Sequence, residues 1–241
     1  MLLSAHQAAS LDARKRSGAH SVGGGGDRLS SLTMTAALAI KRVSYAEYLR
    51  MEARSDVRLE FVDGYAYAMT GGTPRHARLT MRAARLLGAS LDGSPCEPYS
   101  SDLKVHIAEA HRSTYPDITV VCGEPEPSKI DRNAVVNPTV IVEILSPSTE
   151  ADDRGDRWDA YQQIPSLIHY VLVSQDEKRI EVFSRDEGGW RYEGKRGRGT
   201  VKLSWTHGSK ASATRVHASL SIDALYKGIA LPKLRRRPAA S

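Results

Sequence analysis

The sequence is poor in cysteine and has no long hydrophobic run. Its 241 residues contain only Cys96 and Cys122, with no C-x-x-C pair and no cysteine and histidine at zinc-binding spacing. This usage suggests neither a disulfide framework nor a structural zinc site, and it fits a reducing cytosol. No apolar stretch approaches the roughly 20 residues that span a bilayer, and the start of the chain lacks an apolar segment of signal-peptide length. We therefore expect a cytoplasmic protein that does not enter a membrane.

The folded part of the chain also lacks a strong charge of either sign. The formal net charge is +6, but residues 1–33 carry +2 and residues 227–241 carry +5, which leaves residues 34–226 at −1. The overall positive charge is therefore weak support for a nucleic-acid-binding face. With 41% hydrophobic and 26% charged residues, the chain has the composition of an ordinary globular protein.

The chain divides into three parts by composition. Residues 1–33 are rich in Gly, Ser and Ala, contain four consecutive glycines and lack aromatics, so we expect a disordered extension, and Met34 is a candidate natural start. Residues 34–228 carry the hydrophobic periodicity of one folded domain. Residues 229–241 form a basic C-terminal tail.

Local signals along the central part predict alternating helices and strands. Ser44 and Glu47 fit a capping box, Asp63-Gly64 fits a tight hairpin turn, and Thr73-Pro74 fits the start of an amphipathic helix. Further strands are predicted at 101–107, 115–121, 139–145, 168–174, 179–185 and 189–194, and further helices at 152–164 and after Ser221. This order predicts an α/β fold with a central mixed β-sheet flanked by helices.

Two of the predicted strands contain an isolated acidic residue. Asp117 lies in YPDITVV and Glu143 interrupts the apolar run TVIVEIL. A carboxylate buried there costs several kcal/mol, on the order of a buried ion, unless a cation or strong donors meet it. If the strands are neighbours, the two carboxylates converge and could hold Mg²⁺ or Mn²⁺. The alternative is that each acid faces solvent or pairs with an arginine.

Five separated segments resemble the Uma-type restriction endonuclease family of the PD-(D/E)xK nuclease superfamily. They are GYAYAMTGGTPRHARL (64–79), YPDITVVC (115–122), EILSPST (143–149), DRGDRWDAY (153–161) and IPSLIHYVLV (164–173). The resemblance covers about residues 38–228. It implies a restriction endonuclease-like fold and hydrolysis of phosphodiester bonds.

The resemblance also implies a set of site residues. Asp117 and Glu143 become the metal-binding pair, Glu60 a third carboxylate near the site, and His76 a further site residue. The superfamily lysine two residues after the glutamate is replaced by Leu145, and Uma-type sequences place that cation in the next helix, where this chain has Arg157.

Arg157 changes the chemistry that this site could perform. Lysine can lose its proton in a desolvated site, whereas arginine stays charged and cannot act as a general base. Arg157 could still stabilise charge that develops on the phosphate. Lys104, on the strand predicted at 101–107, is a spare candidate for a lysine, or a solvent-facing residue.

Three functions follow as hypotheses. The first is an Mg²⁺- or Mn²⁺-dependent endonuclease that acts on nucleic acid, expected to be DNA, for which a twofold homodimer would suit cleavage of both strands. The second is a module of the same fold that binds nucleic acid or protein without cutting it. The third, a serine hydrolase using Ser146 or Ser148, lacks a histidine at evident relay distance in the sequence.

Overall fold

The computed structural model describes residues 42–209 and 211–232. The expectations for residues 1–33 and for the tail from residue 233 onward lie outside the described residues. Within the described ranges, none of the helices combines the length and apolar character that a membrane crossing needs.

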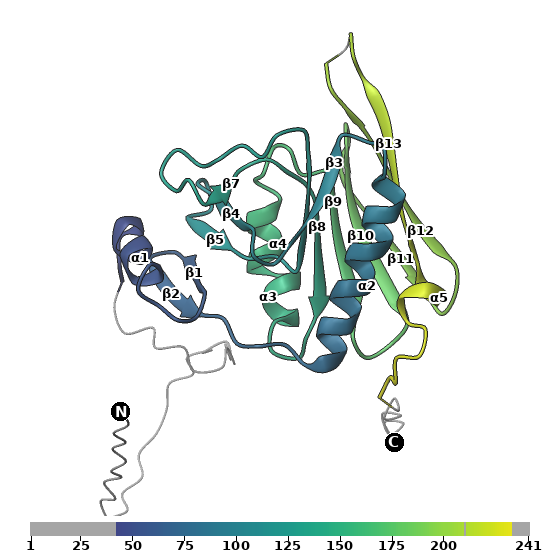
Figure 1. Cartoon of the computed structure of the whole chain (residues 1–241), viewed down its shortest axis with the longest axis horizontal. Helices are drawn as coiled ribbons and strands as arrows, with labels where there is room; N and C mark the ends of the chain where they lie inside the picture. Colours follow the sequence, from purple (N-terminus) through teal and green to yellow (C-terminus); the bar gives the residue numbers. More distant parts are fainter. Residues whose placement is uncertain (1–41, 210, 233–241) are drawn as a thin grey trace, which may run out of the picture. The chain divides into compact units, whose positions relative to one another are not determined.

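Five helices and thirteen strands are found in the described residues (Figure 1). The helices are α1 Tyr45–Glu52, α2 Pro74–Leu91, α3 Glu150–Arg154, α4 Asp156–Tyr161 and α5 Ile222–Leu225. The first strands are β1 Leu59–Val62, β2 Tyr65–Ala68, β3 Cys96–Ser100, β4 Lys104–Ile107, β5 Arg112–Thr114, β6 Ile118–Cys122 and β7 Ala134–Val135. The later strands are β8 Pro138–Leu145, β9 His169–Ser174, β10 Arg179–Asp186, β11 Gly189–Arg196, β12 Thr200–His207 and β13 Thr214–Ser221.

The strands form three sheets. The largest has the order β11-β10-β9-β8-β6-β3, and β8 and β9 are its one parallel pair. A second sheet has the order β2-β1-β5-β4-β7, and β12 pairs with β13 in a separate hairpin. A mixed α/β fold is therefore confirmed.

The central strand β8 is buried on both faces. Val140, Val142 and Ile144 point into the core cluster that contains the inner face of α2 and the hairpin β12–β13. Ile141 and Leu145 point into a second cluster with α4, β4 and β7. Since successive side chains of a strand alternate between faces, Glu143 points to the α4 side.

Helices α3 and α4 occupy the space between the two larger sheets (Figure 1). A single helix over 152–164 was predicted, but the chain breaks at Gly155, whose φ of −116° and ψ of −112° lie outside the helical region. The break rotates α4 relative to α3. Both segments nevertheless contribute side chains to one polar cluster.

Most predicted elements are present, and several strands were not predicted. The capping box of Ser44, the Asp63-Gly64 hairpin and the Thr73 cap of α2 are confirmed. The strands β3, β5, β7, β12 and β13 were missed. β3 contains Pro98, which argues against a strand, but β3 lies at the edge of its sheet, where proline is tolerated.

The expectation of no disulfide is wrong. Cys96 on β3 and Cys122 on β6 lie opposite each other in the antiparallel ladder and are joined by a disulfide. Because β3 was not predicted, the pairing of the two thiols was not expected. The argument from cysteine usage for a reducing compartment falls with it, and a cytoplasmic location stays a prediction.

A buried histidine gives the fold a measurable pH dependence. Burial lowers the pKa of His169 to about 4, and its ring contacts Ser184 Oγ at 2.9 Å and the Ser204 carbonyl oxygen at 3.3 Å. The unfolded chain binds this proton near pH 6.5, so stability is lost as pH falls from about 6.5 to 4. The shift corresponds to about 3 kcal/mol.

We predict that His169→Gln removes this part of the pH dependence. Gln can keep the hydrogen bond to the Ser204 carbonyl and does not titrate. Urea unfolding at pH 7.5 and 4.5 should show a loss of stability on acidification that is smaller in the variant by about 2–3 kcal/mol. Equal losses in both proteins would contradict the assignment.

Candidate functional site

A cavity of about 330 Å³ lies where the two larger sheets and the N-terminus of α2 meet. Its walls are the loop after β2, the first turn of α2, the loop after β8, and α3 with α4. All five predicted site residues line it: Glu60, His76, Asp117, Glu143 and Arg157. The sequence segments that carry them are up to 97 residues apart.

Strand pairing brings Asp117 and Glu143 together. β6 is antiparallel to β8 with Ile118 opposite Val142, so Asp117 lies beside Glu143 where the regular ladder ends. The Asp117 amide donates to Glu143 Oε2 at 3.1 Å, and the Ile144 amide donates to Asp117 Oδ2 at 2.7 Å. Each carboxylate thus accepts a backbone hydrogen bond from the neighbouring strand, which fixes both side chains at the same sheet edge.

Glu143 is compensated only in part. Tyr161 donates its hydroxyl proton to Glu143 Oε1 at 2.8 Å, and Arg157 Nη1 lies 3.5 Å from the same oxygen. Burial raises the pKa of Glu143 well above its usual value; Arg157 opposes the shift, while Asp153 and Asp117 add to it. The nearby donors therefore do not fully compensate the ionised form of Glu143, and burial favours its protonated form.

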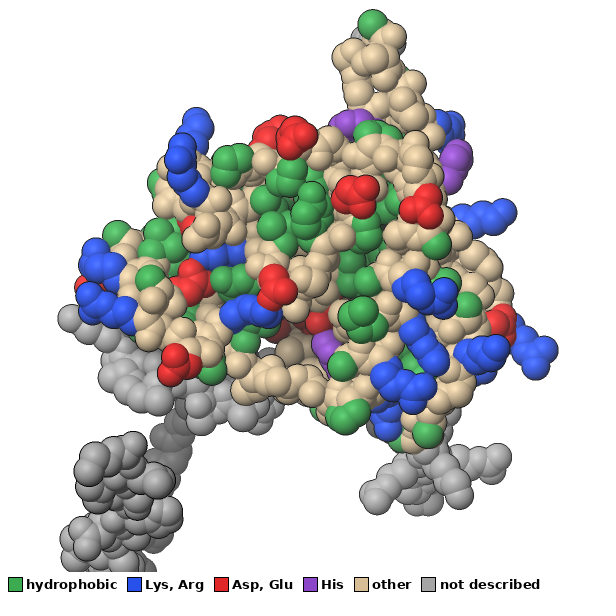
Figure 2. All heavy atoms as spheres, in the orientation of Figure 1, with side chains coloured by type: hydrophobic (Ala, Val, Ile, Leu, Met, Phe, Trp, Pro, Cys, Tyr) green, Lys and Arg blue, Asp and Glu red, His purple; other side chains and the backbone are tan. Residues whose placement is uncertain are grey.

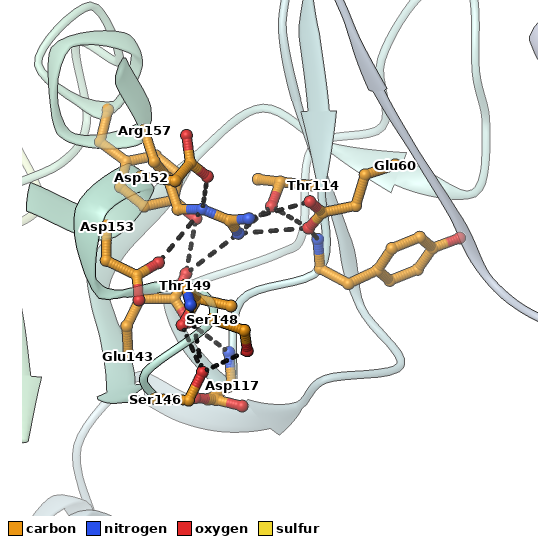
Figure 3. A network of polar contacts seen from close by, with 12 residues as sticks. Glu60, Thr114, Asp117, Glu143, Ser146, Ser148, Thr149, Asp152, Asp153 and Arg157 are labelled. Atoms are coloured by element: carbon orange, nitrogen blue, oxygen red, sulfur yellow. Dashed lines mark hydrogen bonds and ion pairs between the residues drawn. The ribbon is translucent and has the colours of Figure 1, made fainter. Parts of the chain in front are cut away.

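Arg157 is the cation around which the acidic side chains gather (Figure 3). Its guanidinium forms a two-pronged contact with Glu60, at 3.2 and 2.9 Å, and donates to Thr114 Oγ1 at 2.6 Å. Burial acts to raise the pKa of Glu60, but Arg157 and the hydrogen bonds of Thr114 and Tyr115 lower it overall. Glu60 and Arg157 are both buried, so this is an ion pair held inside the protein.

Two further acids in the cluster were not predicted as site residues. Arg157 Nε lies 2.8 Å from Asp152 Oδ2 and 3.3 Å from Asp153 Oδ1. Arg112 also binds Asp152, at 2.5 Å. Burial raises the pKa of Asp153 to about 6, with Asp152 and Asp117 adding to the shift and Arg157 opposing it. The i,i+4 spacing of Asp153 and Arg157 was the available signal.

His76 enters the cavity from the first turn of α2. Its backbone N–H is capped by Thr73 Oγ1 at 3.1 Å, and its Nε2 lies 3.1 Å from Asp117 Oδ2. Burial acts to lower the pKa of His76, but the hydrogen bond and charge of Asp117 outweigh it and raise the pKa overall. His76 therefore interacts with the same carboxylate that ends β6.

The donor set suits a hard divalent cation. Asp117 Oδ2 contacts both His76 Nε2 and the Ile144 amide. None of the described residues donates a hydrogen bond to Asp117 Oδ1. Two guanidinium groups, those of Arg112 and Arg157, are the permanent positive charges near five carboxyl groups, those of Glu60, Asp117, Glu143, Asp152 and Asp153. Carboxylate oxygens with unneutralised charge fit Mg²⁺ or Mn²⁺. Within the ranges described, however, no group of three or more His, Cys, Asp or Glu side chains is already arranged around an ion position.

Lys104 lies outside this cluster. Its ammonium is buried and pairs with Glu52 at 2.5 Å and Asp131 at 2.7 Å, below a separate pocket. Two carboxylates thus compensate the buried ammonium. The structure does not place Lys104 where it could replace a lysine at position 157.

The serine side chains of the loop after β8 contact other hydroxyl groups. Ser146 Oγ lies 2.9 Å from Ser148 Oγ and 2.9 Å from Thr149 Oγ1. Among the described histidines, none forms a hydrogen bond with either serine. The hydroxyl groups line the cavity, but they lack the activating base of a serine hydrolase.

The chain belongs to the nuclease-like family described as "Uma2: Putative restriction endonuclease", whose model matches residues 45–204. The chain is therefore a member of a restriction endonuclease-like class of proteins. Two proteins of Synechocystis sp. are similar to the chain. Uncharacterized protein slr1290 is 34% identical over 190 residues, which are 78% of this chain and 94% of that protein. Uncharacterized protein sll1609 is 33% identical over 145 residues, 60% and 82% of the two chains.

A solved structure supports the fold. It is described as "a putative nuclease belonging to DUF820" from Anabaena variabilis, and it superposes with a TM-score of 0.55 at 16% identity. The similarity covers 76% of this chain and 97% of the other. A restriction endonuclease-like fold, expected from the sequence resemblance, is thereby confirmed.

We predict that Arg157→Gln is strongly destabilising. Removal of one partner from a buried ion pair costs about 3–5 kcal/mol, because the remaining charges stay buried without compensation. Glu60 and Asp152 have lowered pKa values, so the stability they gain from Arg157 is present above their unfolded pKa and is lost as pH falls.

Urea unfolding at pH 8 and pH 4.5 measures this effect. The deficit of the variant should be larger at pH 8. Arg50→Gln, on the exposed surface of α1, is a matched control that should change stability by less than about 0.5 kcal/mol. A deficit below about 1 kcal/mol for Arg157→Gln would show that the cluster does not depend on this cation.

Proposed function

We propose that this protein is an Mg²⁺-dependent endonuclease that hydrolyses phosphodiester bonds in DNA. The observation that carries the proposal is the pair of carboxylates, Asp117 and Glu143, fixed side by side at one sheet edge in an open cavity. Membership of a restriction endonuclease-like family supports it. The excess of carboxylates over guanidinium groups gives a divalent cation an electrostatic reason to bind.

Asp117 and Glu143 would hold the metal ion. When bound, the ion would supply a Lewis acid for a phosphate oxygen and lower the pKa of a coordinated water. Asp153 would also interact with the charge of the metal ion, because it is a buried residue of the cavity wall. We assign it to the site together with the carboxylates predicted from the sequence.

His76 would position Asp117. With Nε2 protonated, the ring donates to Asp117 Oδ2, which leaves Oδ1 for the ion. Such a hydrogen bond orients a ligand and tunes its basicity, and losing it commonly costs about 10–100-fold in metal affinity or activity. His76 thus acts through Asp117.

Arg157 would hold the acidic cluster together. Its guanidinium is engaged by Glu60, Asp152 and Thr114, so few N–H groups are left for a substrate. It stays protonated and cannot accept a proton from water. The water would have to lose its proton to a metal-bound group or to solvent.

The burial of Arg157 among acids supports a second candidate function. A buried arginine that is fully engaged by acids could mark a fold that has kept its architecture and lost the lysine chemistry. The protein would then bind nucleic acid or another protein without cutting it. The retention of Asp117 and Glu143 at one edge favours the enzyme.

We predict that Asp117→Asn abolishes Mg²⁺-dependent nicking of plasmid DNA. The amide removes one anionic ligand, so cleavage should fall at least about 100-fold. The Mg²⁺-dependent rise in melting temperature should shrink as well, because ligand binding stabilises the folded state. Asp156→Asn, an exposed acid outside the cavity, is the matched control and should retain both effects. Cleavage that persists in a clean preparation of Asp117→Asn would remove the assignment.

We predict that Arg157→Lys increases cleavage. A lysine can act as a general base, an effect worth about 10²–10⁴-fold in favourable cases. A gain of tenfold or more, measured as single-turnover cleavage at saturating Mg²⁺, would identify the cation as the limiting group. An unchanged rate in a folded variant would show that proton transfer at position 157 is not limiting. No cleavage in either protein, with DNA binding retained, would favour the binding module.

A further inference from the structure

Helix α2 carries a row of arginines and no acidic residue. Its sequence PRHARLTMRAARLLGASL places arginine at 75, 78, 82 and 85. At 100° per residue these four positions fall within about 80° of the helix circumference. The spacing therefore makes one continuous basic stripe, which we call the α2 stripe.

The core packing of α2 directs this stripe outward. Leu79, Ala83, Leu87 and Leu91 are buried and face the largest sheet and the hairpin β12–β13. The opposite side is exposed, and even Met81 between the arginines is 69% exposed. The arginines thus lie on the side of α2 away from the sheet and the hairpin, and Arg78 and Arg85 are exposed there.

The members of the stripe differ in their partners. Arg75 contacts the Gln175 carbonyl and Asp176, and Arg82 donates to the carbonyl oxygens of Leu225 and Lys227. Arg78 and Arg85 are exposed, and no carboxylate of a described residue pairs with either of them. By contrast, Arg58, Arg179 and Arg191 on the strands and loops each have an acidic partner.

The stripe starts at the candidate site. Thr73 and His76, at the first turn of α2, line the cavity; Arg75, the first member of the stripe, lies between them in the sequence, and none of the four arginines lines the cavity itself. Figure 2 shows Lys and Arg side chains gathered over α2 and α5, on the same face as the hollow beside α2. A polyanion that lies across this face could therefore contact both the basic side chains and the mouth of the cavity.

We propose that the α2 stripe binds the phosphate backbone of duplex DNA next to the cleavage site. This inference rests on the proposed function, because it supplies the surface that holds the substrate. Arg78 and Arg85 are the contacts with free charge, and Arg75 and Arg82 hold the flank of the helix. Seven residues of helix separate the two free arginines by about 10 Å, which matches the axial rise of about three base pairs.

The partner is identified by charge and regularity. The domain outside the chain ends is close to neutral, so the stripe is a local feature and does not reflect a generally basic protein. Phosphates provide the densest regular negative charge of common ligands, and contacts to them position a protein without reading sequence. Binding should therefore depend strongly on salt and little on sequence.

The test compares DNA binding by the full chain and its variants. A fluorescent 20-base-pair duplex is titrated by anisotropy in EDTA, which prevents cleavage, between 50 and 200 mM KCl. Arg78→Gln with Arg85→Gln should weaken binding at least about fivefold and lower the slope of log K against log salt by about 2. Arg78→Glu with Arg85→Glu should weaken it further.

A matched control and clear opposing outcomes accompany the test. Arg50→Glu with Arg54→Glu makes the same change of charge at two exposed positions, one in α1 and one just after it, and should leave the affinity within about twofold. Equal losses in both pairs would replace the stripe by general attraction and overturn the proposal. Two further results would overturn the proposal. The first is that the wild-type chain does not bind duplex DNA. The second is that the α2 variants bind DNA as the wild type does and differ from it only in oligomeric state.

The outcomes separate this inference from the proposed function. If Asp117→Asn binds DNA through the stripe but the wild type does not cleave it, the surface stands and the nuclease activity fails. If the wild type cleaves and the α2 variants cleave and bind normally, the activity stands and the surface fails. Circular dichroism of the Gln pair, which keeps good helix formers on α2, verifies that the fold is retained.

Discussion

The candidate site depends on one buried cation. Arg157 is buried in α4 and contacts acids from β1 and α3, with Glu143 of β8 close by. In a low-dielectric interior these carboxylates would repel one another strongly, and the guanidinium offsets part of that repulsion. The five-stranded sheet, the six-stranded sheet and the helical segment between them are thus joined by an ion-pair cluster as well as by apolar packing.

That cluster has one consequence for chemistry. Because Arg157 is shared among several acids, it does not fully compensate Glu143 and Asp153 in their ionised forms, and the pKa values of both acids are raised. A site that only needed stability would do better with balanced charge or with apolar side chains. Acids whose ionised forms lack full compensation are understandable beside an open cavity if a cationic ligand supplies the missing charge, which links the energetics of the fold to the proposed metal site.

Local chemistry allowed much of the fold to be predicted. The Ser44 box, the Asp63-Gly64 turn and the Thr73-Pro74 start each act through neighbouring residues, so the sequence shows them directly. The alternation of Val201, Leu203 and Trp205 with polar residues is a local signal of the strand β12. β3 and the Cys96–Cys122 disulfide depend on a strand neighbour distant in sequence, which periodicity does not reveal.

The site residues show the same limit of prediction from the sequence. Resemblance selected Glu60, Asp117 and Glu143, but only the pairing of β6 with β8 explains why two of them share one edge, and only α4 shows what meets Glu143. Asp153 was not predicted because an acid in the first turn of a helix is equally typical of a solvated residue that interacts with the helix dipole. The interruption of an apolar strand by an acid was thus the informative signal, since burying that charge has a cost that the surrounding protein must compensate, and the compensating residues define the site.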